Sequence, residues 1–273
     1  KYITFTKYCD TWKLKINVSK TKVMIISKGN PKCKTNFKIG NDILEFVNEY
    51  KYLGLIFTKS GSYLKAKLHI AAQANKALFA LLKKIKRLSL PYDLQIDLFQ
   101  KTIKPILLYG SETWGYGNLD ALERIQLKFL KYTSKMKKST PTYMVYGEFG
   151  LTPIAVDIKN RLISYWAKLV DNINEQNSTK LASRVYLLNY SLYSQKLIKS
   201  PWFDHIKEVL CTSGFSGIWY CQSFANVKWL TKSTHQKLKD LYIQKWYAEI
   251  ENTSNTKFYK IVKTQFEQTS YII

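Results

Sequence analysis

Two aspartates stand four residues apart on one expected helix, a spacing that could bring two carboxylates to a divalent cation. They are Asp93 and Asp97, inside an apolar helical pattern that covers residues 91–109. Both fall in the first turns of that helix, where acidic side chains complement the positive end of the helix dipole. We therefore expect them to stabilise the start of the helix rather than to bind a metal ion.

Histidine and cysteine, the usual zinc ligands, are too far apart in the sequence to suggest a zinc site. The residues concerned are His205, Cys211, Cys221 and His235, whereas structural zinc sites normally use cysteine pairs roughly two to four residues apart. No Ser-His-Asp or Cys-His arrangement and no glycine-rich phosphate loop is visible either. We expect no metal site and no cofactor in this chain.

The strongest chemical signal is an excess of lysine. The chain has 43 Lys and Arg against 19 Asp and Glu, a net charge of +24, and only four of the basic residues are Arg. A lysine ammonium is a point charge that suits phosphates, whereas the arginine fork reads guanine edges. The composition therefore favours a protein that binds the phosphate backbone of a nucleic acid rather than one that reads its base sequence. The alternative is that the lysines form a solvated surface with no binding role.

Much of this charge falls on one expected amphipathic helix, residues 62–88. Its apolar stripe is predicted to comprise Leu64, Leu68, Ala71, Ala72, Leu78, Leu81, Leu82 and Ile85. The basic side chains of the same helix are Lys65, Lys67, Lys76, Lys83, Lys84, Lys86 and Arg87.

Length and composition exclude several classes of protein. The chain has 273 residues, 46% of them apolar, which is too many for a disordered chain. Four cysteines do not make a disulfide scaffold, so we expect an intracellular protein. The longest uncharged stretch, Val209–Val227, contains too many polar residues and glycines for a membrane span, and the first residues do not resemble a secretory signal.

The pattern of elements predicts an α+β fold that is predominantly α-helical, with a short N-terminal antiparallel β part. Strands are expected at Leu14 and Ile16, at residues 23–26, in a hairpin over 37–47, and over 50–57 with Gly54 in mid-strand. Helices are expected near 1–12, 62–88, 91–109 (disturbed at Pro105), 118–135, 153–175, 178–197, 201–212, 232–251 and 254–268. Asn118, Thr152 and Ser200 are expected as helix caps.

Several motifs, in order, resemble the reverse transcriptases of non-LTR (LINE-type) retrotransposons, best the jockey-like group. Residues 14–24 (LKINVSKTKVM), after Cys9 and Trp12, resemble the segment that follows the catalytic aspartates, and residues 50–54 (YKYLG) resemble the primer-grip hairpin. Residues 105–115 (PILLYGSETWG) resemble the thumb signature, and residues 146–153 (YGEFGLTP), followed by Arg161 and Tyr165-Trp166, continue it.

The resemblance implies a fragment of an RNA-directed DNA polymerase. Residues 1–59 would be the end of the palm, 60–150 a thumb-like helical region and 151–273 a C-terminal helical region. The chain contains no Asp-Asp dipeptide, so the Mg²⁺ ions of the parent enzyme would be held by residues outside it, and we expect no polymerase activity from this chain alone. Its partners would be an RNA template, a DNA primer or their hybrid duplex, and the rest of the polymerase, in nucleus and cytoplasm.

The resemblance also assigns roles to residues. Lys20 would protonate the departing pyrophosphate, with Lys22 as its rival. Alternatively, Lys20 is simply a surface lysine, and Asn17 holds the loop through side-chain-to-backbone bonds. Tyr52, Leu53 and Gly54 would support the primer end, unless Tyr52 and Leu53 merely pack under their strand. The basic side chains of residues 62–88 would lie near the template–primer duplex.

Two other functions remain open at this point. The chain could be a non-enzymatic, basic helical module that binds nucleic acid, from a domesticated or degenerate element. It could instead bind proteins through its aromatic C-terminal helices. Trp114, Tyr109 and Glu112 are expected to be core and loop-fixing residues rather than stacking platforms.

Overall fold

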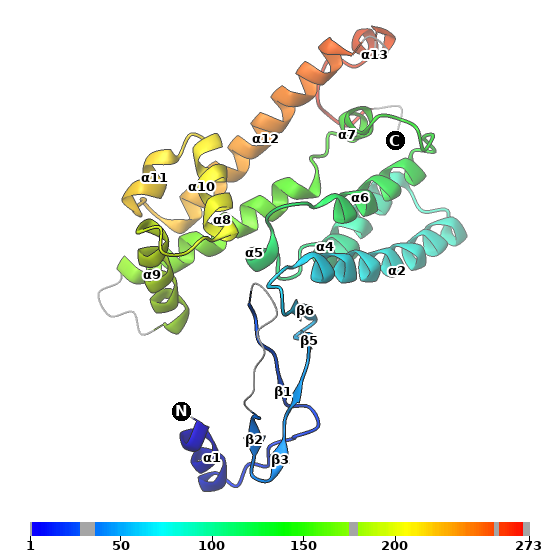
Figure 1. Cartoon of the computed structure of the whole chain (residues 1–273). Helices are drawn as coiled ribbons and strands as arrows, with labels where there is room; N and C mark the ends of the chain where they lie inside the picture. The colour runs from blue at the N-terminus through cyan, green and yellow to red at the C-terminus, as the bar shows by residue number, and fades with distance from the viewer. Residues whose placement is uncertain (1, 28–35, 175–179, 254–256, 270–273) are drawn as a thin grey trace. The chain divides into compact units, whose positions relative to one another are not determined.

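The computed structural model describes residues 2–27, 36–174, 180–253 and 257–269. The chain divides into two compact units, residues 1–69 and 70–273. It is predominantly helical, with a few short strands, as the sequence predicts (Figure 1). The boundary between the two units, after residue 69, falls inside the helix over residues 64–88. It lies ten residues beyond the domain boundary that the sequence predicts after residue 59.

The described residues of the first unit form one complete helix, six short strands and the start of α2. Helix α1 (Tyr2–Thr11) is followed by β1 (Lys22–Val23), β2 (Lys38–Ile39), β3 (Asp42–Ile43), β4 (Glu45–Phe46), β5 (Glu49–Tyr52) and β6 (Leu55–Thr58). The predicted hairpin over 37–47 is confirmed, since β2 and β3 pair antiparallel. However, β1 and β4 pair in parallel, so the expectation of a wholly antiparallel part is wrong.

Two predicted strands are absent or short in this unit. Leu14 and Ile16 lie outside any strand, and of the run at 23–26 only Val23 is in β1. A strand needs a partner for its backbone N–H and C=O groups, and β1 has only the two residues of β4 to pair with. Apolar residue type alone therefore overestimates the strand content here.

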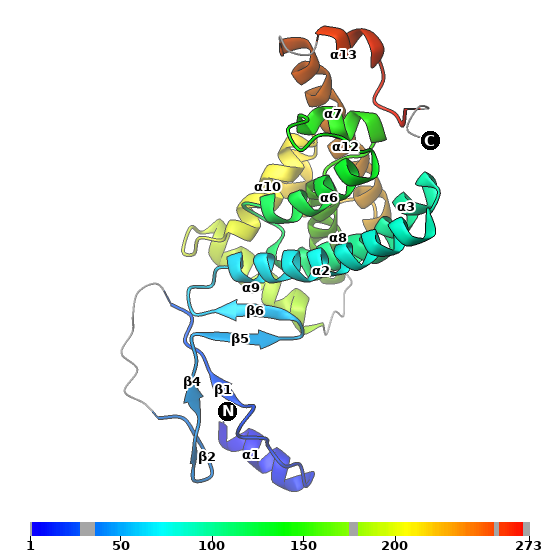
Figure 2. The same cartoon turned by 90° about the vertical axis from the view of Figure 1, so that its right-hand side faces the viewer.

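The strand predicted over residues 50–57 is instead a hairpin. Strands β5 and β6 pair antiparallel, with Tyr52 opposite Leu55, and Leu53 and Gly54 form the turn between them (Figure 2). Both turn residues have positive φ, 46° for Leu53 and 84° for Gly54, as two-residue hairpin turns of type I′ require. Gly54 is therefore a turn residue and not the mid-strand bulge that the pattern suggested.

The described residues of the second unit form helices and their connections, with no strand among them. Helix α2 (Leu64–Leu88) leads into it and is followed by α3 (Tyr92–Leu98), the π-helical turn η1 (Phe99–Ile103), α4 (Lys104–Leu107), α5 (Ser111–Trp114), α6 (Asp120–Thr133) and α7 (Thr142–Phe149). The remaining helices are α8 (Ile154–Asn174), α9 (Leu181–Ser194), α10 (Pro201–Thr212), α11 (Ser216–Cys221), α12 (Val227–Asn252) and α13 (Lys257–Val262). Helices α5, α7 and α11 lack a separate sequence prediction, and α13 is shorter than expected.

Pro105 disturbs its helix as predicted, in a specific way. Proline has no N–H to offer the carbonyl four residues earlier, so an α-helical register cannot continue through it. The chain widens into the π-helical turn η1 just before Pro105 and returns to α-helix in α4.

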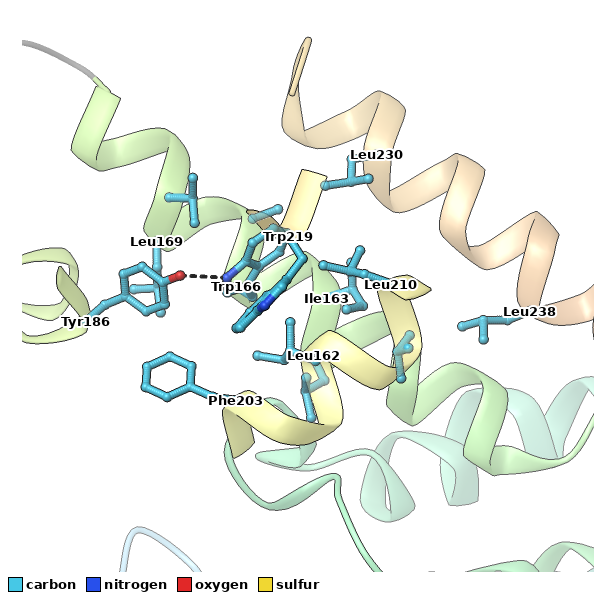
Figure 3. Close-up of a cluster of buried hydrophobic side chains, with 14 of the residues drawn as sticks. Leu162, Ile163, Trp166, Leu169, Tyr186, Phe203, Leu210, Trp219, Leu230 and Leu238 are labelled. Carbon is cyan, nitrogen blue, oxygen red and sulfur yellow. Dashed lines mark hydrogen bonds between the residues drawn. The ribbon is translucent and has the colours of Figure 1, made fainter. Parts of the chain in front are cut away.

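The core of the second unit is built around α8, which packs against α5, α9, α10 and α12. Leu162, Ile163 and Trp166 of α8 are fully buried among Phe203, Leu210, Trp219 and Leu230 (Figure 3). The indole Nε1 of Trp166 donates to the hydroxyl oxygen of Tyr186 at 2.8 Å, so the one polar atom of this ring is satisfied.

One of the three predicted helix caps is confirmed, since Ser200 Oγ accepts from the N–H of Phe203 at the start of α10. The N-cap of α6 is Leu119 and not Asn118, whose Oδ1 accepts from the N–H of Asp120. The expected cap at Thr152 is wrong, because α8 is capped from a distance. Glu123, on α6, accepts from the N–H groups of Ile154 (3.2 Å) and Ala155 (2.7 Å) and from the Tyr146 hydroxyl (2.7 Å).

Candidate nucleic-acid interface

The loop that carries Lys20 is held in shape by Asn17. The Asn17 side-chain oxygen accepts from the N–H of Lys20 at 3.0 Å and from the Ser19 hydroxyl at 2.7 Å, and the Asn17 carbonyl accepts from Thr21 Oγ1. This confirms the structural role expected of Asn17. The loop thus has a defined conformation that presents the Lys20 side chain to solvent.

The structure distinguishes the two candidate lysines. Lys22 Nζ binds Glu45 Oε2 at 2.6 Å across the β1–β4 pair, and its side chain is partly buried. Lys20 is exposed, and its ammonium makes no ion pair with any residue that the structure describes. Of the two lysines, Lys20 is therefore the one whose ammonium is exposed and makes no ion pair with a described residue.

The β5–β6 hairpin is tied to the same loop. The hydroxyl of Tyr50 donates to the backbone carbonyl of Lys20 at 3.0 Å. At the far end of the hairpin both Tyr52 and Leu53 are exposed, Leu53 to 71%. The interpretation that these two side chains pack under their strand is therefore wrong, since both are exposed.

Leu53 is an unfavourable residue for its own turn. A non-glycine side chain in the left-handed region costs roughly 1–2 kcal/mol, whereas asparagine tolerates it and is common there. We therefore predict that Leu53→Asn raises the free energy of unfolding of the hairpin by about 1 kcal/mol, measured by hydrogen exchange of its cross-strand amides. Leu53→Ala is the control, because it shortens the side chain but retains the strain. Equal protection in the two variants would contradict this account.

The basic side chains of α2 divide into three groups. Lys65 binds Glu49, and Lys67 is only 7% exposed, with its pKa lowered by burial. The expectation that Lys67 lies on the open basic face is therefore wrong. The remaining five are exposed and make no ion pair with any described residue: Lys76, Lys83, Lys84, Lys86 and Arg87.

The apolar stripe of α2 is correct at its C-terminal end and wrong at its N-terminal end. Leu78, Leu81, Leu82 and Ile85 are buried as predicted. Leu64, Leu68 and Ala72 are exposed, and the buried positions there are Ala66, Ile70, Ala71 and Ala74. At the start of α2 the buried face is therefore rotated around the helix axis relative to the predicted one. Lys67 lies on this buried face.

An exposed aromatic ring lies within the basic face. Phe79 is 54% exposed and stands three residues after Lys76 and four before Lys83, which places the three side chains together on one helix face. Lys128, on α6, binds Asn75 and places its Nζ 3.7 Å from the centre of the Phe79 ring. Sequence reasoning missed both residues, although a phenylalanine off the apolar stripe was a usable signal for Phe79.

The other candidate residues have structural roles. Trp114 is fully buried and donates to the carbonyl of Tyr109, while Glu112 pairs with Arg161 at 3.8 Å. The ring of Tyr109 is exposed, so it is not the core residue that we expected.

No metal site can be assigned from the described residues. Asp97 pairs with Lys101, and Asp93 accepts from Gln268. Within the described ranges no group of three His, Cys, Asp or Glu side chains lies close enough together to hold a metal ion.

Comparison with known proteins gives no relative for this chain. No protein-family model, curated protein or solved structure matches it. Among the described residues no helix is long and apolar enough to cross a membrane. The functional interpretation therefore depends on the motifs of the sequence and on the surfaces described above.

Proposed function

We propose that this chain is the end of the palm and the thumb-like region of a non-LTR retrotransposon reverse transcriptase, and that it holds a primer–template duplex. The observation that carries the proposal is the basic face of α2, defined by Lys76, Phe79, Lys83, Lys84, Lys86 and Arg87. Its cations have no acidic partner among the described residues, and four of the five are lysines, which suit phosphates rather than base edges.

The first unit supports the same proposal through a separate surface. The ordered Lys20 loop, its bond to Tyr50 and the exposed turn at Leu53 and Gly54 belong to one connected set of residues. In the parent enzyme the ammonium of Lys20 would donate a proton to the departing pyrophosphate, and the hairpin tip would support the primer end. The metal-dependent step would use carboxylates outside this chain.

The test is binding of the purified chain to a primer–template duplex, titrated from low to high salt. We expect log K to fall steeply with log salt, because each neutralised phosphate releases counterions. Alanine at Lys83, Lys84 and Lys86 should flatten the slope by up to about 2.7, since each lost contact with duplex is worth roughly 0.9.

The matched control removes three other lysines and so the same total charge. Lys228, Lys232 and Lys237 lie on α12, are exposed and make no ion pair with a described residue. Alanine at these positions should leave the slope nearly unchanged. An equal effect of both triple variants would mean that net charge alone attracts the duplex, and no binding at low salt would refute the proposal.

A further inference from the structure

One pocket of the helical unit combines aromatic rings with lysines, away from the basic face of α2. It has a volume of about 550 Å³ and lies where the end of α9, the start of α10 and the end of α11 meet. Its lining includes the aromatic residues Tyr190, Tyr193, Trp219 and Tyr220 and the charged residues Lys196, Lys199, Asp204 and Lys207, together with Ser194 and Ile198.

The floor of this pocket is a fixed aromatic cluster. Trp219 is buried in the core, and the rings of Tyr190 and Tyr193 meet it edge-on, with centroids 5.6 and 6.3 Å away. The Tyr193 hydroxyl donates to Asp204 at 2.6 Å, and burial together with this bond raises the pKa of Tyr193 to about 12. The three rings therefore form a preorganised, uncharged wall, with the Asp204 carboxylate bonded to its edge.

One aromatic ring at the rim is open to solvent. Tyr220 is 65% exposed, although its neighbour Trp219 is buried. The ammonium of Lys207 lies 5.3 Å from the centre of the Tyr220 ring. The Lys207 ammonium lies over one face of the Tyr220 ring. A base stacked on the opposite face would bring its attached phosphate close to this charge.

Three lysines surround the pocket, and its one acidic side chain is already engaged. Lys196 is held at the end of α9 with φ 59°, its N–H donating to the Tyr193 carbonyl at 2.9 Å. Lys199 and Lys207 complete the cationic rim, while Asp204 accepts from Tyr193. The rim is therefore positive, and its cations are point charges rather than guanidinium forks.

These features select among anionic ligands. A peptide carboxylate is best recognised by arginine in a bidentate fork, and no arginine lines this pocket. A duplex keeps its bases stacked on each other, so a lone aromatic platform suits an unpaired base. A single-stranded nucleic acid supplies both the free ring and the flanking phosphates.

We propose that this pocket binds one nucleotide of a single-stranded nucleic acid, with its base on Tyr220 and its phosphates at Lys196, Lys199 and Lys207. The inference rests on the proposed function in so far as both concern nucleic acid. It adds a separate site and a different substrate class. In a polymerase, such a site would hold an unpaired part of the template or primer strand.

The experiment measures the affinity of the purified full chain for a fluorescent twelve-nucleotide oligo(dT), which cannot form a duplex with itself. Tyr220→Ala should weaken this affinity by roughly 5- to 100-fold, the range expected when one stacking interaction is lost. Tyr220→Phe should retain it, since the ring remains. Alanine at Lys196, Lys199 and Lys207 should weaken binding and reduce its salt dependence.

The controls separate this site from the α2 face. Tyr132→Ala removes an exposed tyrosine of α6 and should change nothing. Tyr220→Ala should leave affinity for the primer–template duplex within about twofold of wild type, and Tyr220 is too exposed for its truncation to unfold the chain. If Tyr220→Ala leaves oligo(dT) binding unchanged, the pocket proposal is wrong. If the α2 triple variant loses duplex binding in the same experiments, the proposed function of α2 still holds.

Two further results would also overturn it. Failure of oligo(dT) to bind at low salt would exclude a single-strand site. Displacement of oligo(dT) by poly-glutamate at equal charge concentration would show that the pocket takes any polyanion, including an acidic protein segment, and that no base is recognised.

Discussion

Replacing Trp166 with alanine is expected to lower the free energy of unfolding of the helical unit by about 3–5 kcal/mol, the cost of removing a buried tryptophan. Trp166 is fully buried, its ring is about 6 Å from those of Trp219 and Phe224, and its Nε1 is bonded to Tyr186. The substitution leaves a cavity on α8, the helix that α9, α10 and α12 all contact.

The measurement is urea denaturation of the full chain followed by circular dichroism at 222 nm, because most helical residues belong to this unit. Trp229→Ala is the matched control, since Trp229 lies on α12 and is exposed. It should cost less than about 1 kcal/mol. Equal losses in the two variants would mean that the buried cluster is not the core that holds these helices together.

Trp166→Phe separates packing from hydrogen bonding. Phenylalanine retains most of the ring but leaves the Tyr186 hydroxyl without the indole donor. We expect a loss between those of the alanine variant and the control. A loss as large as that of Trp166→Ala would assign the stability to the bond rather than to the buried ring.

The sequence predicts most of the helices, and the reason is visible in α2. Its C-terminal half carries large aliphatic residues, Leu78, Leu81, Leu82 and Ile85, at helical spacing, and these are buried. Its N-terminal half buries three alanines together with Lys67 and Ile70, and it has Leu64 and Leu68 on the exposed side. A pattern based on size and hydrophobicity therefore chose the wrong face there, and it placed Lys67 with the exposed lysines.

Turn chemistry explains the error at the β5–β6 hairpin. Two-residue turns of this kind usually show Asn-Gly or Asp-Gly, and Leu53-Gly54 lacks that signal. An apolar run from Tyr50 to Phe57 was then interpreted as one strand. Only the resemblance to a primer-grip motif implied a hairpin, and the strained, exposed leucine is the feature that still links this turn to a possible function.

Some features of the candidate sites depend on residues distant in sequence and could not be predicted locally. Lys22 is bound by Glu45, which reaches it only through the β1–β4 pairing. The pocket at Tyr220 requires α9, α10 and α11 to meet. Helix α7 is different, because Pro141 before it and Gly150 after it, with φ 58°, were local signals for its two ends.

The cap of α8 is the clearest case of a partner that is distant in the sequence. Its removal is the second substitution that we expect to lower the free energy of unfolding strongly. Glu123 lies on α6, yet its carboxylate accepts from two N–H groups at the start of α8 and from the hydroxyl of Tyr146. Removing it with Glu123→Ala leaves three donors without their acceptor in a largely buried place. Each unsatisfied buried donor costs about 1–3 kcal/mol, so we expect a loss of at least about 3 kcal/mol in urea denaturation.

The same residue predicts a pH dependence whose sign follows from its burial. Burial raises the pKa of Glu123, against the opposing effect of its hydrogen bonds from Tyr146 and Ala155. A group with a raised folded-state pKa contributes stability that is fully present below its unfolded pKa, near 4.3, and is lost as the pH rises through the folded value. Wild type should therefore gain stability relative to Glu123→Gln as the pH falls from 7 toward 4.3, because glutamine does not titrate.

Denaturation of both proteins across this pH range measures the difference directly, since all other ionisable groups are common to the two and cancel. Asp120→Asn is the control, because it removes a charge from the exposed first turn of the same helix, where its pairing with Asn118 is open to solvent. A difference between wild type and Glu123→Gln that shrinks on acidification would mean that the hydrogen bonds outweigh burial. The carboxylate would then be held in its charged form as a strong cap, and the joint between α6 and α8 would weaken in acid instead of strengthening.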